Sequence, residues 1–153
     1  MVNLRFMGGT QEVGRNAVLV DTNGSNILLD YGVKIGDKPQ FPGHIRAKDV
    51  DGIIVSHAHL DHSGGVPQFY LRDEKPFFAT PVTTGLMRIL IRDMIKLSGY
   101  WLPFEYVEFE AMLKQTRNLA YKEKVKMKNV EFNLLDAGHI PGSSMVELAT
   151  GGK

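Results

Sequence analysis

The feature that most constrains this chain is a run of potential metal ligands that directly follows an apolar segment. Residues 52–56, Gly-Ile-Ile-Val-Ser, form an uninterrupted apolar run that predicts a strand buried on both faces. His57, His59, Asp61 and His62 follow it, so four potential ligands lie within six positions. In an extended chain, residues two apart project to the same side, so His57 and His59 can converge on one ion. Asp61 and His62 are then expected to turn toward a second ion, which is the spacing of a paired-metal loop.

The sequence also restricts which side chains can hold a metal. It contains no cysteine, which excludes disulfides, thiolate zinc sites and cysteine nucleophiles. A metal must be held by histidine and carboxylate, and a catalytic zinc ion takes three protein ligands and leaves one position for water. We expect His139 to be the third ligand of the first ion, because it follows an apolar strand and the permissive residue Gly138. A surface or core histidine is the alternative for His139 alone. His44 is expected to be an ordinary loop residue.

A structural zinc site is the alternative interpretation of the cluster as a whole. The five candidate ligands exceed what one closed tetrahedral site can use. Two ions roughly 3.5 to 4 Å apart would polarise the bond under attack and lower the pKa of a bridging water toward neutrality. The cluster therefore favours hydrolytic chemistry.

Apolar runs and turn signals elsewhere predict alternating strands and helices. Residues 16–20 and 26–30 are separated by a turn that contains Asn23 and Gly24, which predicts a β-hairpin. A loop is expected over 32–48. Further expected elements are strands at 76–80, 130–135 and 145–149, a short helix at Pro67, a long helix capped by Thr83 or Thr84 and ended by Gly99, and a helix over 105–116.

Length and composition are those of one soluble globular domain, with 153 residues of which 43% are hydrophobic and 23% charged. The chain has no apolar run that could span a bilayer and no apolar core of a secretory signal, so we expect a cytoplasmic protein without a membrane partner. Residues 150–152, Thr-Gly-Gly, read as a hairpin turn with no partner strand after it. We therefore expect the chain to be a fragment of a longer protein.

Two other features are weighed against simpler interpretations. Four lysines alternate with other residues and would share one face of a strand: Lys122, Lys124, Lys126 and Lys128. Such a face could contact phosphates, but an edge strand protected by lysines is the favoured interpretation. Tyr100 and Trp101 follow the end of the long helix, where core packing is favoured over base stacking.

Residues 56–64, Ser-His-Ala-His-Leu-Asp-His-Ser-Gly, resemble the signature of the metallo-β-lactamase superfamily, which is hydrolytic in most members and folds as an αβ/βα sandwich. Three further segments narrow the resemblance to the β-CASP nucleases: 8–16 (Gly-Gly-Thr-Gln-Glu-Val-Gly-Arg-Asn), 28–32 (Leu-Leu-Asp-Tyr-Gly) and 138–144 (Gly-His-Ile-Pro-Gly-Ser-Ser). The chain is most similar to the archaeal relatives of cleavage and polyadenylation specificity factor and to ribonuclease J. The resemblance implies an α/β fold, with residues 1–153 as the N-terminal half of a metallo-β-lactamase αβ/βα sandwich, a mixed sheet with flanking helices.

The resemblance also implies roles for individual residues. Three histidines match the ligands of one ion: His57, His59 and His139. Asp61 and His62 match ligands of the other ion, and Asp61 is the candidate to orient or deprotonate the attacking water. Asp30 matches an acid that orients the loop and its ligands, although a turn former at a strand end is the alternative. The family's later bridging aspartate, its further histidines and its β-CASP insertion have no counterpart in these residues, so the second ion has only two ligands here.

The implied function is that of a metal-dependent phosphodiesterase, a ribonuclease of RNA processing or decay that carries two Zn²⁺ ions in the parent enzyme. It would cleave single-stranded RNA by in-line attack of metal-bound hydroxide on phosphorus, leaving a 5′-phosphate and a 3′-hydroxyl. The chain alone is expected to be weakly active or inactive. DNA as a substrate, endonucleolytic or exonucleolytic action, the metal's identity and a homodimer are left open. The alternatives are a small-molecule hydrolase of the same fold and a non-catalytic metal-binding module.

Overall fold

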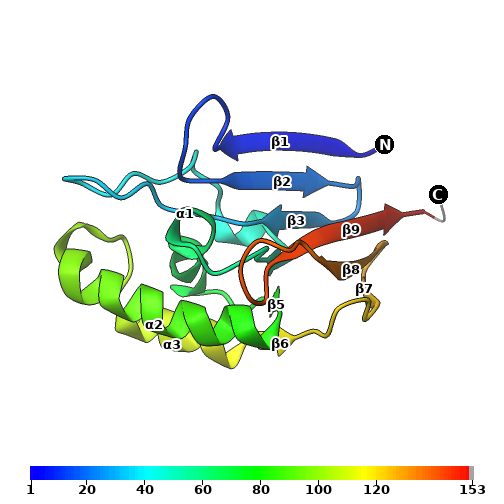
Figure 1. Ribbon diagram of the computed structural model, residues 1–153. Helices are drawn as coiled ribbons and strands as arrows, with labels where there is room; N and C mark the ends of the chain where they lie inside the picture. Colours follow the sequence, from blue (N-terminus) through cyan, green and yellow to red (C-terminus); the bar gives the residue numbers. More distant parts are fainter. Residues whose placement is uncertain (152–153) are drawn as a thin grey trace.

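The computed structural model of the chain describes residues 1–151. A mixed sheet of six strands lies at its centre, in the order β1–β2–β3–β4–β5–β6 (Figure 1). The first three strands pair antiparallel and the pairs from β3 to β6 are parallel. Their bounds are β1 (Asn3–Gly8), β2 (Ala17–Asp21), β3 (Asn26–Leu29), β4 (Gly52–Ile54), β5 (Phe77–Ala79) and β6 (Thr116–Asn118).

A second, antiparallel sheet and a set of helices pack on opposite faces of the central sheet. The second sheet contains β7 (Val125–Met127), β8 (Val130–Asp136) and β9 (Ser144–Thr150). The α-helices are α1 (Leu60–Ser63), α2 (Pro81–Ser98) and α3 (Tyr106–Lys114), and the 3₁₀ turns are η1 (Ala47–Asp49), η2 (Val66–Tyr70) and η3 (Gly99–Trp101). No helix among the described residues has the length and apolar character needed to cross a membrane.

Alternate residues of the central strands point into two different cores. In β4, Ile53 belongs to the core shared with the helices, whereas Ile54 belongs to the core shared with the second sheet. Phe77 and Phe78 of β5 divide in the same way. Because successive side chains of a strand face opposite sides, an uninterrupted apolar run is what a central layer requires. The expectation that residues 52–56 include a strand buried on both faces is therefore confirmed.

Most expected elements are confirmed, with corrections at their ends. The hairpin is β2 with β3, which pair antiparallel from Val18–Leu29 to Asp21–Asn26. The long helix begins after Thr80 and not at Thr83 or Thr84, because Thr80 accepts a hydrogen bond from the Thr83 amide and Pro81 occupies the first turn. Strands β1 and β6 were not predicted, because most residues of β1 are exposed and β6 consists of three polar residues.

The structure favours an edge strand over a phosphate-binding face for the lysine segment, residues 122–128. Strand β7 lies at the edge of its sheet and contains only one of the four lysines, Lys126. Lys122 and Lys128 have φ values of 67° and 52°, so the four side chains do not share one strand face. Lys124 lies 3.1 Å from Glu131, and Lys128 lies 2.6 Å from Asp51. An edge strand with charged side chains is thus confirmed.

Core packing of Tyr100 and Trp101 is wrong as a prediction. Tyr100 is 91% exposed and Trp101 is 47% exposed. The last buried residue of α2 is Met94, and both residues lie beyond it. Lys38 lies over the Trp101 ring at 4.7 Å from its centroid.

At the C-terminal end of the described residues, β9 ends at Thr150 and Gly151 is in a turn. Gly152 of the expected hairpin turn lies outside the described residues.

Candidate metal centre

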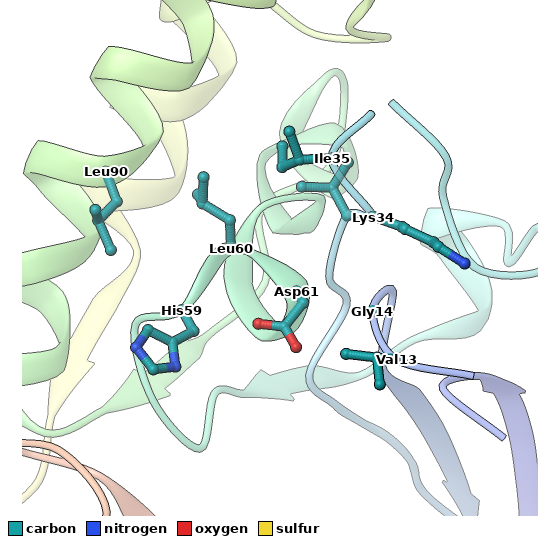
Figure 2. A pocket seen from close by; sticks show the side chains of 9 residues that line it. Val13, Gly14, Lys34, Ile35, His59, Leu60, Asp61 and Leu90 are labelled. Atoms are coloured by element: carbon teal, nitrogen blue, oxygen red, sulfur yellow. The ribbon is translucent and has the colours of Figure 1, made fainter. Parts of the chain in front are cut away.

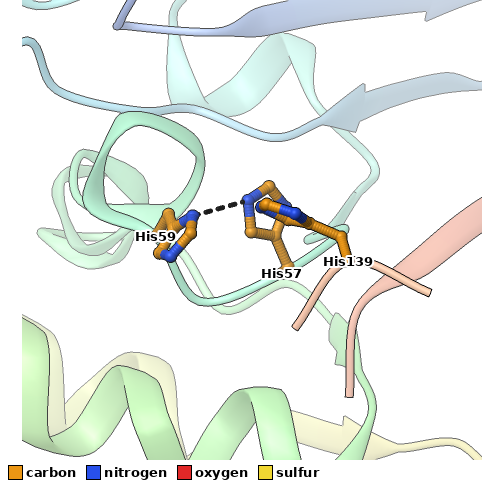
Figure 3. Close-up of side chains that lie close together, drawn as sticks. All are labelled: His57, His59 and His139. Atoms are coloured by element: carbon orange, nitrogen blue, oxygen red, sulfur yellow. Dashed lines mark hydrogen bonds between the residues drawn. The ribbon is translucent and has the colours of Figure 1, made fainter. Parts of the chain in front are cut away.

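Three histidines converge where the loop after β4 meets the loop between β8 and β9. Figure 3 shows the side chains of His57, His59 and His139 close together. Their potential ligand atoms all lie within 4.8 Å of one another. His57 Nε2 lies 3.2 Å from His59 Nδ1, and His57 Nδ1 lies 3.0 Å from the Ser56 hydroxyl. His57 is buried, whereas His59 and His139 are exposed. The group therefore offers three imidazole nitrogens around one point, with access from solvent.

The chemistry of this donor set fits a divalent cation. Burial lowers the pKa of His57 to about 4, and repulsion by the neighbouring His62 adds to this effect. His57 is therefore neutral at pH 7 and keeps a lone pair for a metal. Three imidazoles with a fourth position facing solvent are a common ligand set of catalytic zinc sites.

Asp61 and His62 lie beside this group, on the short helix α1. The helical turn that starts at Leu60 carries them away from the extended direction of His57 and His59. His62 Nε2 lies 3.6 Å from Asp61 Oδ2, and the ring centroids of His57 and His62 are 4.1 Å apart. The structure thus places the five candidate ligands side by side, as a group of three and a neighbouring pair.

Asp30 joins the end of β3 to the metal loop. Its Oδ1 accepts a hydrogen bond from the Ser56 amide at 2.7 Å, and its Oδ2 accepts one from the Ser56 hydroxyl at 2.7 Å. The same Oδ2 lies 2.8 Å from His62 Nδ1. Burial alone would lower the pKa of His62, but the hydrogen bond and charge of Asp30, with the charge of Asp61, outweigh it and raise the pKa. These contacts favour the orienting role of Asp30 over that of a simple turn former.

Asn16 is a site residue that the sequence analysis did not single out. Its backbone amide donates to the Asp61 carbonyl at 2.8 Å, and its side-chain amide lies 3.3 Å from Asp61 Oδ2 and 3.1 Å from His62 Nε2. Glu12 stabilises the loop before Asn16 through ion pairs with Arg15 at 2.6 Å and with Lys34 at 3.1 Å. The sequence signal that could have identified Asn16 is its place at the end of a glycine-rich loop, directly before a buried strand.

Gly32 allows two segments of the site to touch. A Cβ atom at this position would lie 1.7 Å from the Asp61 carbonyl oxygen. Residues on either side of Gly32 bind the metal loop through the backbone: the Tyr31 amide donates to the His62 carbonyl, and the Val33 amide donates to the Leu60 carbonyl, both at 2.8 Å. Glycine is required here because only its lack of a side chain permits this approach.

A cleft of about 500 Å³ opens beside His59 and Asp61 (Figure 2). Its walls are mostly apolar and come from the loop before β2, the loop after β3, α1 and α2. The side chains that form them include Val13, Ile35, Leu60 and Leu90. A substrate held in this cleft would reach the candidate metal ligands directly.

Comparison with known proteins shows a family match over part of the chain. A sequence profile of the metallo-beta-lactamase superfamily matches residues 10–81. A metallo-β-lactamase from Cronobacter sakazakii with a HARLDQ motif superposes with a TM-score of 0.63 at 18% identity, over 96% of this chain and 55% of that protein. MEM-A1, a subclass B3 metallo-β-lactamase from a soil metagenome, gives 0.63 at 20% identity over 97% and 55% of the two chains. Residues 10–81 therefore match the metallo-β-lactamase superfamily, and the expected mixed sheet with flanking helices is confirmed.

Its sequence relatives are archaeal cleavage-factor-like and ribonuclease J-like proteins, which confirms the narrower resemblance. RNase aCSPSF2 of Saccharolobus solfataricus is 36% identical over 96% of this chain and 30% of its own length. An RNase J-like protein of Methanocaldococcus jannaschii is 35% identical over 100% and 35%. Transcription termination factor FttA of Thermococcus kodakarensis is 34% identical over 98% and 26%. The chain thus spans 26–35% of the length of these relatives. The superfamily whose profile matches residues 10–81 implies a divalent metal, which the three-histidine group could hold.

Proposed function

We propose that this chain is the N-terminal, metal-binding portion of a metal-dependent phosphodiesterase that cleaves single-stranded RNA in RNA processing or decay. The observation that carries the proposal is the convergence of His57, His59 and His139 within 4.8 Å, beside the carboxylate of Asp61. Two of the relatives quoted above are named as RNase or RNase J-like, which supports RNA as the substrate class. Their greater length supports a parent protein that continues beyond this domain portion.

The proposed ligand sets follow the two groups in the structure. His57, His59 and His139 hold one cation, and Zn²⁺ suits an all-imidazole set. Asp61 and His62 supply two ligands for a second cation, and the remaining ligands come from the rest of the parent protein. When bound, the cations supply Lewis acidity at the scissile phosphate and lower the pKa of a water near them toward neutrality.

The two carboxylates of the site have different proposed roles. Asp61 has a partly exposed side chain on the side of the cleft, so it can orient the attacking water and accept its proton. Asp30 is the other candidate catalytic carboxylate, but both of its oxygens already accept hydrogen bonds from Ser56 or contact His62. Asp30 is therefore proposed to position the loop and His62, and not to take a proton from substrate or water.

The test compares three proteins on a 5′-labelled single-stranded RNA: residues 1–153, the complete product of the gene, and the complete product with Asp61→Asn. The complete product should cleave the RNA only when a divalent cation is present, Asp61→Asn should abolish cleavage, and residues 1–153 should show little or none. Asp93→Asn is the matched control, since Asp93 is an exposed carboxylate on α2.

Other outcomes would contradict this proposal. Intact RNA after incubation with the metal-loaded complete product, together with hydrolysis of a small thioester, would establish the small-molecule alternative that an apolar cleft could also serve. Metal binding without turnover of either substrate would establish a binding module. Metal-dependent RNA cleavage by residues 1–153 alone would overturn the expectation that this portion is weak or inactive.

A further inference from the structure

His139 is the candidate ligand whose position depends most on distant contacts. His57 and His59 share one loop, so a cation that binds one of them is already close to the other. His139 comes from the loop 137–143, between β8 and β9. Its position relative to the other two therefore depends on how this loop is attached to the rest of the protein.

Within the loop, Ser143 holds the backbone around His139. The Ser143 hydroxyl oxygen accepts hydrogen bonds from the amides of His139 and Ile140, both at 3.1 Å. The Ser143 amide donates to the Ile140 carbonyl at 2.9 Å and closes the turn. The loop is thus a compact unit, and it can move only as a unit if its external contacts are lost.

Two threonines at the start of α2 attach this unit to the core. The hydroxyls of Thr80 and Thr83 lie 2.8 Å and 2.9 Å from the Gly142 carbonyl oxygen. The two side chains are buried, with exposed fractions of 4% and 0%. The two hydroxyls lie 3.0 Å from each other, so either can donate to the carbonyl or to its neighbour. Thr80 Oγ1 also caps α2 by accepting the Thr83 amide, whereas the Thr83 hydroxyl has no part in the cap, so substitution of Thr83 tests the contact with the loop alone.

The contact with Gly142 is also close in steric terms. Gly142 has a φ of 82°, and a Cβ atom there would lie 2.8 Å from both Thr80 Oγ1 and Val82 Cβ. A glycine in the left-handed region thus allows the loop to press against the first turn of α2. On the other side, the Ser144 amide donates to the Ser56 carbonyl at 2.8 Å, next to His57. The loop is held between α2 and the strand end that carries the first ligand.

We propose that Thr83, assisted by Thr80, is a positioning residue that fixes His139 as the third metal ligand. This inference rests on the metal site proposed above. A buried hydroxyl that donates to the loop restricts the loop before the cation arrives, so less freedom is lost on binding. Partners that hold a metal ligand in place typically contribute ~10- to 100-fold to metal affinity. Neither threonine touches the metal, so the effect is transmitted through the backbone from Gly142 to His139.

The test measures the affinity of the full chain for Zn²⁺ by competition with a chromophoric chelator. Thr83→Val, which keeps the shape and removes the hydroxyl, should weaken binding by about 10-fold. Thr83→Ser, which keeps the hydroxyl, should restore most of the affinity. Thr84→Val is the matched control, because Thr84 is also buried. Its hydroxyl donates to the Thr80 backbone carbonyl or to Asn118 Oδ1 and does not contact the loop. Thr84→Val should lower stability by a similar amount and leave the affinity unchanged.

A double-mutant comparison separates positioning from general damage. When His139→Ala has already removed the ligand, Thr83→Val should cause no further loss of Zn²⁺ affinity. The inference is overturned if Thr83→Val leaves affinity unchanged, if Thr84→Val weakens binding as much, or if the Thr83→Val loss persists in the His139→Ala background. These results are distinct from failure of the metal site itself, in which the unsubstituted chain would bind no Zn²⁺ and His139→Ala would have no effect.

Discussion

Asp30 Oδ2 lies 2.8 Å from Nδ1 of His62, and this contact joins the end of β3 to the metal loop. A hydrogen bond at Nδ1 places the other nitrogen, Nε2, toward Asp61 at 3.6 Å. Asp30 adopts a φ of 56°, which asparagine and aspartate tolerate better than other side chains. One carboxylate therefore orients His62, which with Asp61 is proposed to hold the second cation.

Asp30→Asn is expected to weaken this orientation without changing the backbone. The substitution keeps the size of the side chain but removes the charge that His62 and Ser56 contact. We expect Zn²⁺ affinity to fall ~10- to 100-fold. We also expect the metal-free protein to lose about 1.5–3 kcal/mol, the usual contribution of a hydrogen bond to a charged group. Chelator competition and urea denaturation in EDTA measure the two effects, and Asp37→Asn in the exposed loop is the control. Unchanged Zn²⁺ affinity would show that Asp30 is only a turn former.

The two histidines outside the metal loop should respond differently to substitution. His139 contributes to the three-histidine group, whereas His44 lies exposed in a loop, as expected from the sequence. His139→Ala should weaken Zn²⁺ binding by more than the ~100-fold that loss of an outer partner costs, because a direct ligand is removed. His44→Ala should leave binding unchanged. Isothermal titration of both variants with Zn²⁺ measures this difference, and equal affinities for both variants would remove His139 from the site.

Two glycine substitutions test how closely the segments of the site must approach. Gly32→Ala places a Cβ atom 1.7 Å from the Asp61 carbonyl, so one of the two segments must move. We expect a loss of more than about 3 kcal/mol in unfolding free energy, together with loss of Zn²⁺ binding. Gly85→Ala is the control, since a Cβ atom at this position in α2 meets nothing within 4 Å. It should stabilise the protein by up to about 1 kcal/mol, as alanine favours helix over glycine. Thermal denaturation compares the two variants. A Gly32→Ala protein of normal stability would contradict the close packing of Gly32 against the Asp61 carbonyl.

Contacts between residues near in sequence were predictable here, and so was the approach of the distant His139, which follows an apolar strand; most other contacts between distant residues were not. The apolar run of β4 and the spacing of His57 and His59 carry their own signal, because strand periodicity decides where those side chains point. Asn16, Thr80 and Thr83 carry no such signal. Their hydrogen bonds reach Asp61 or Gly142, and those pairings exist only once the sheets have assembled. Strand β6 could not be predicted for the same reason, because its three polar residues form a strand only by pairing with β5.

Asp51 connects parts of both sheets and should make stability depend on pH. Its Oδ1 lies 2.6 Å from Lys128 Nζ, beside the β7–β8 turn, and its Oδ2 accepts from the Asn26 amide of β3 at 2.9 Å. Partial burial raises the pKa of Asp51, but the hydrogen bonds from Lys128 and Asn26 outweigh this and lower it below 3.8. A carboxyl whose folded pKa is depressed stabilises the protein above its unfolded pKa, and this contribution is lost as pH falls through the folded pKa.

Asp51→Asn should therefore destabilise the protein near neutral pH and much less in acid. The pair is partly exposed, so we expect a loss of only about 0.5–1 kcal/mol near pH 7. The difference between the variant and the unsubstituted chain should shrink as the pH falls below the ordinary value of 3.8. Urea midpoints measured near neutral pH and in acid test this, with Glu131→Gln as the control for an exposed pair with Lys124. A difference that stays constant across this range would mean that Asp51 acts through its shape and backbone contact, and not through its charge.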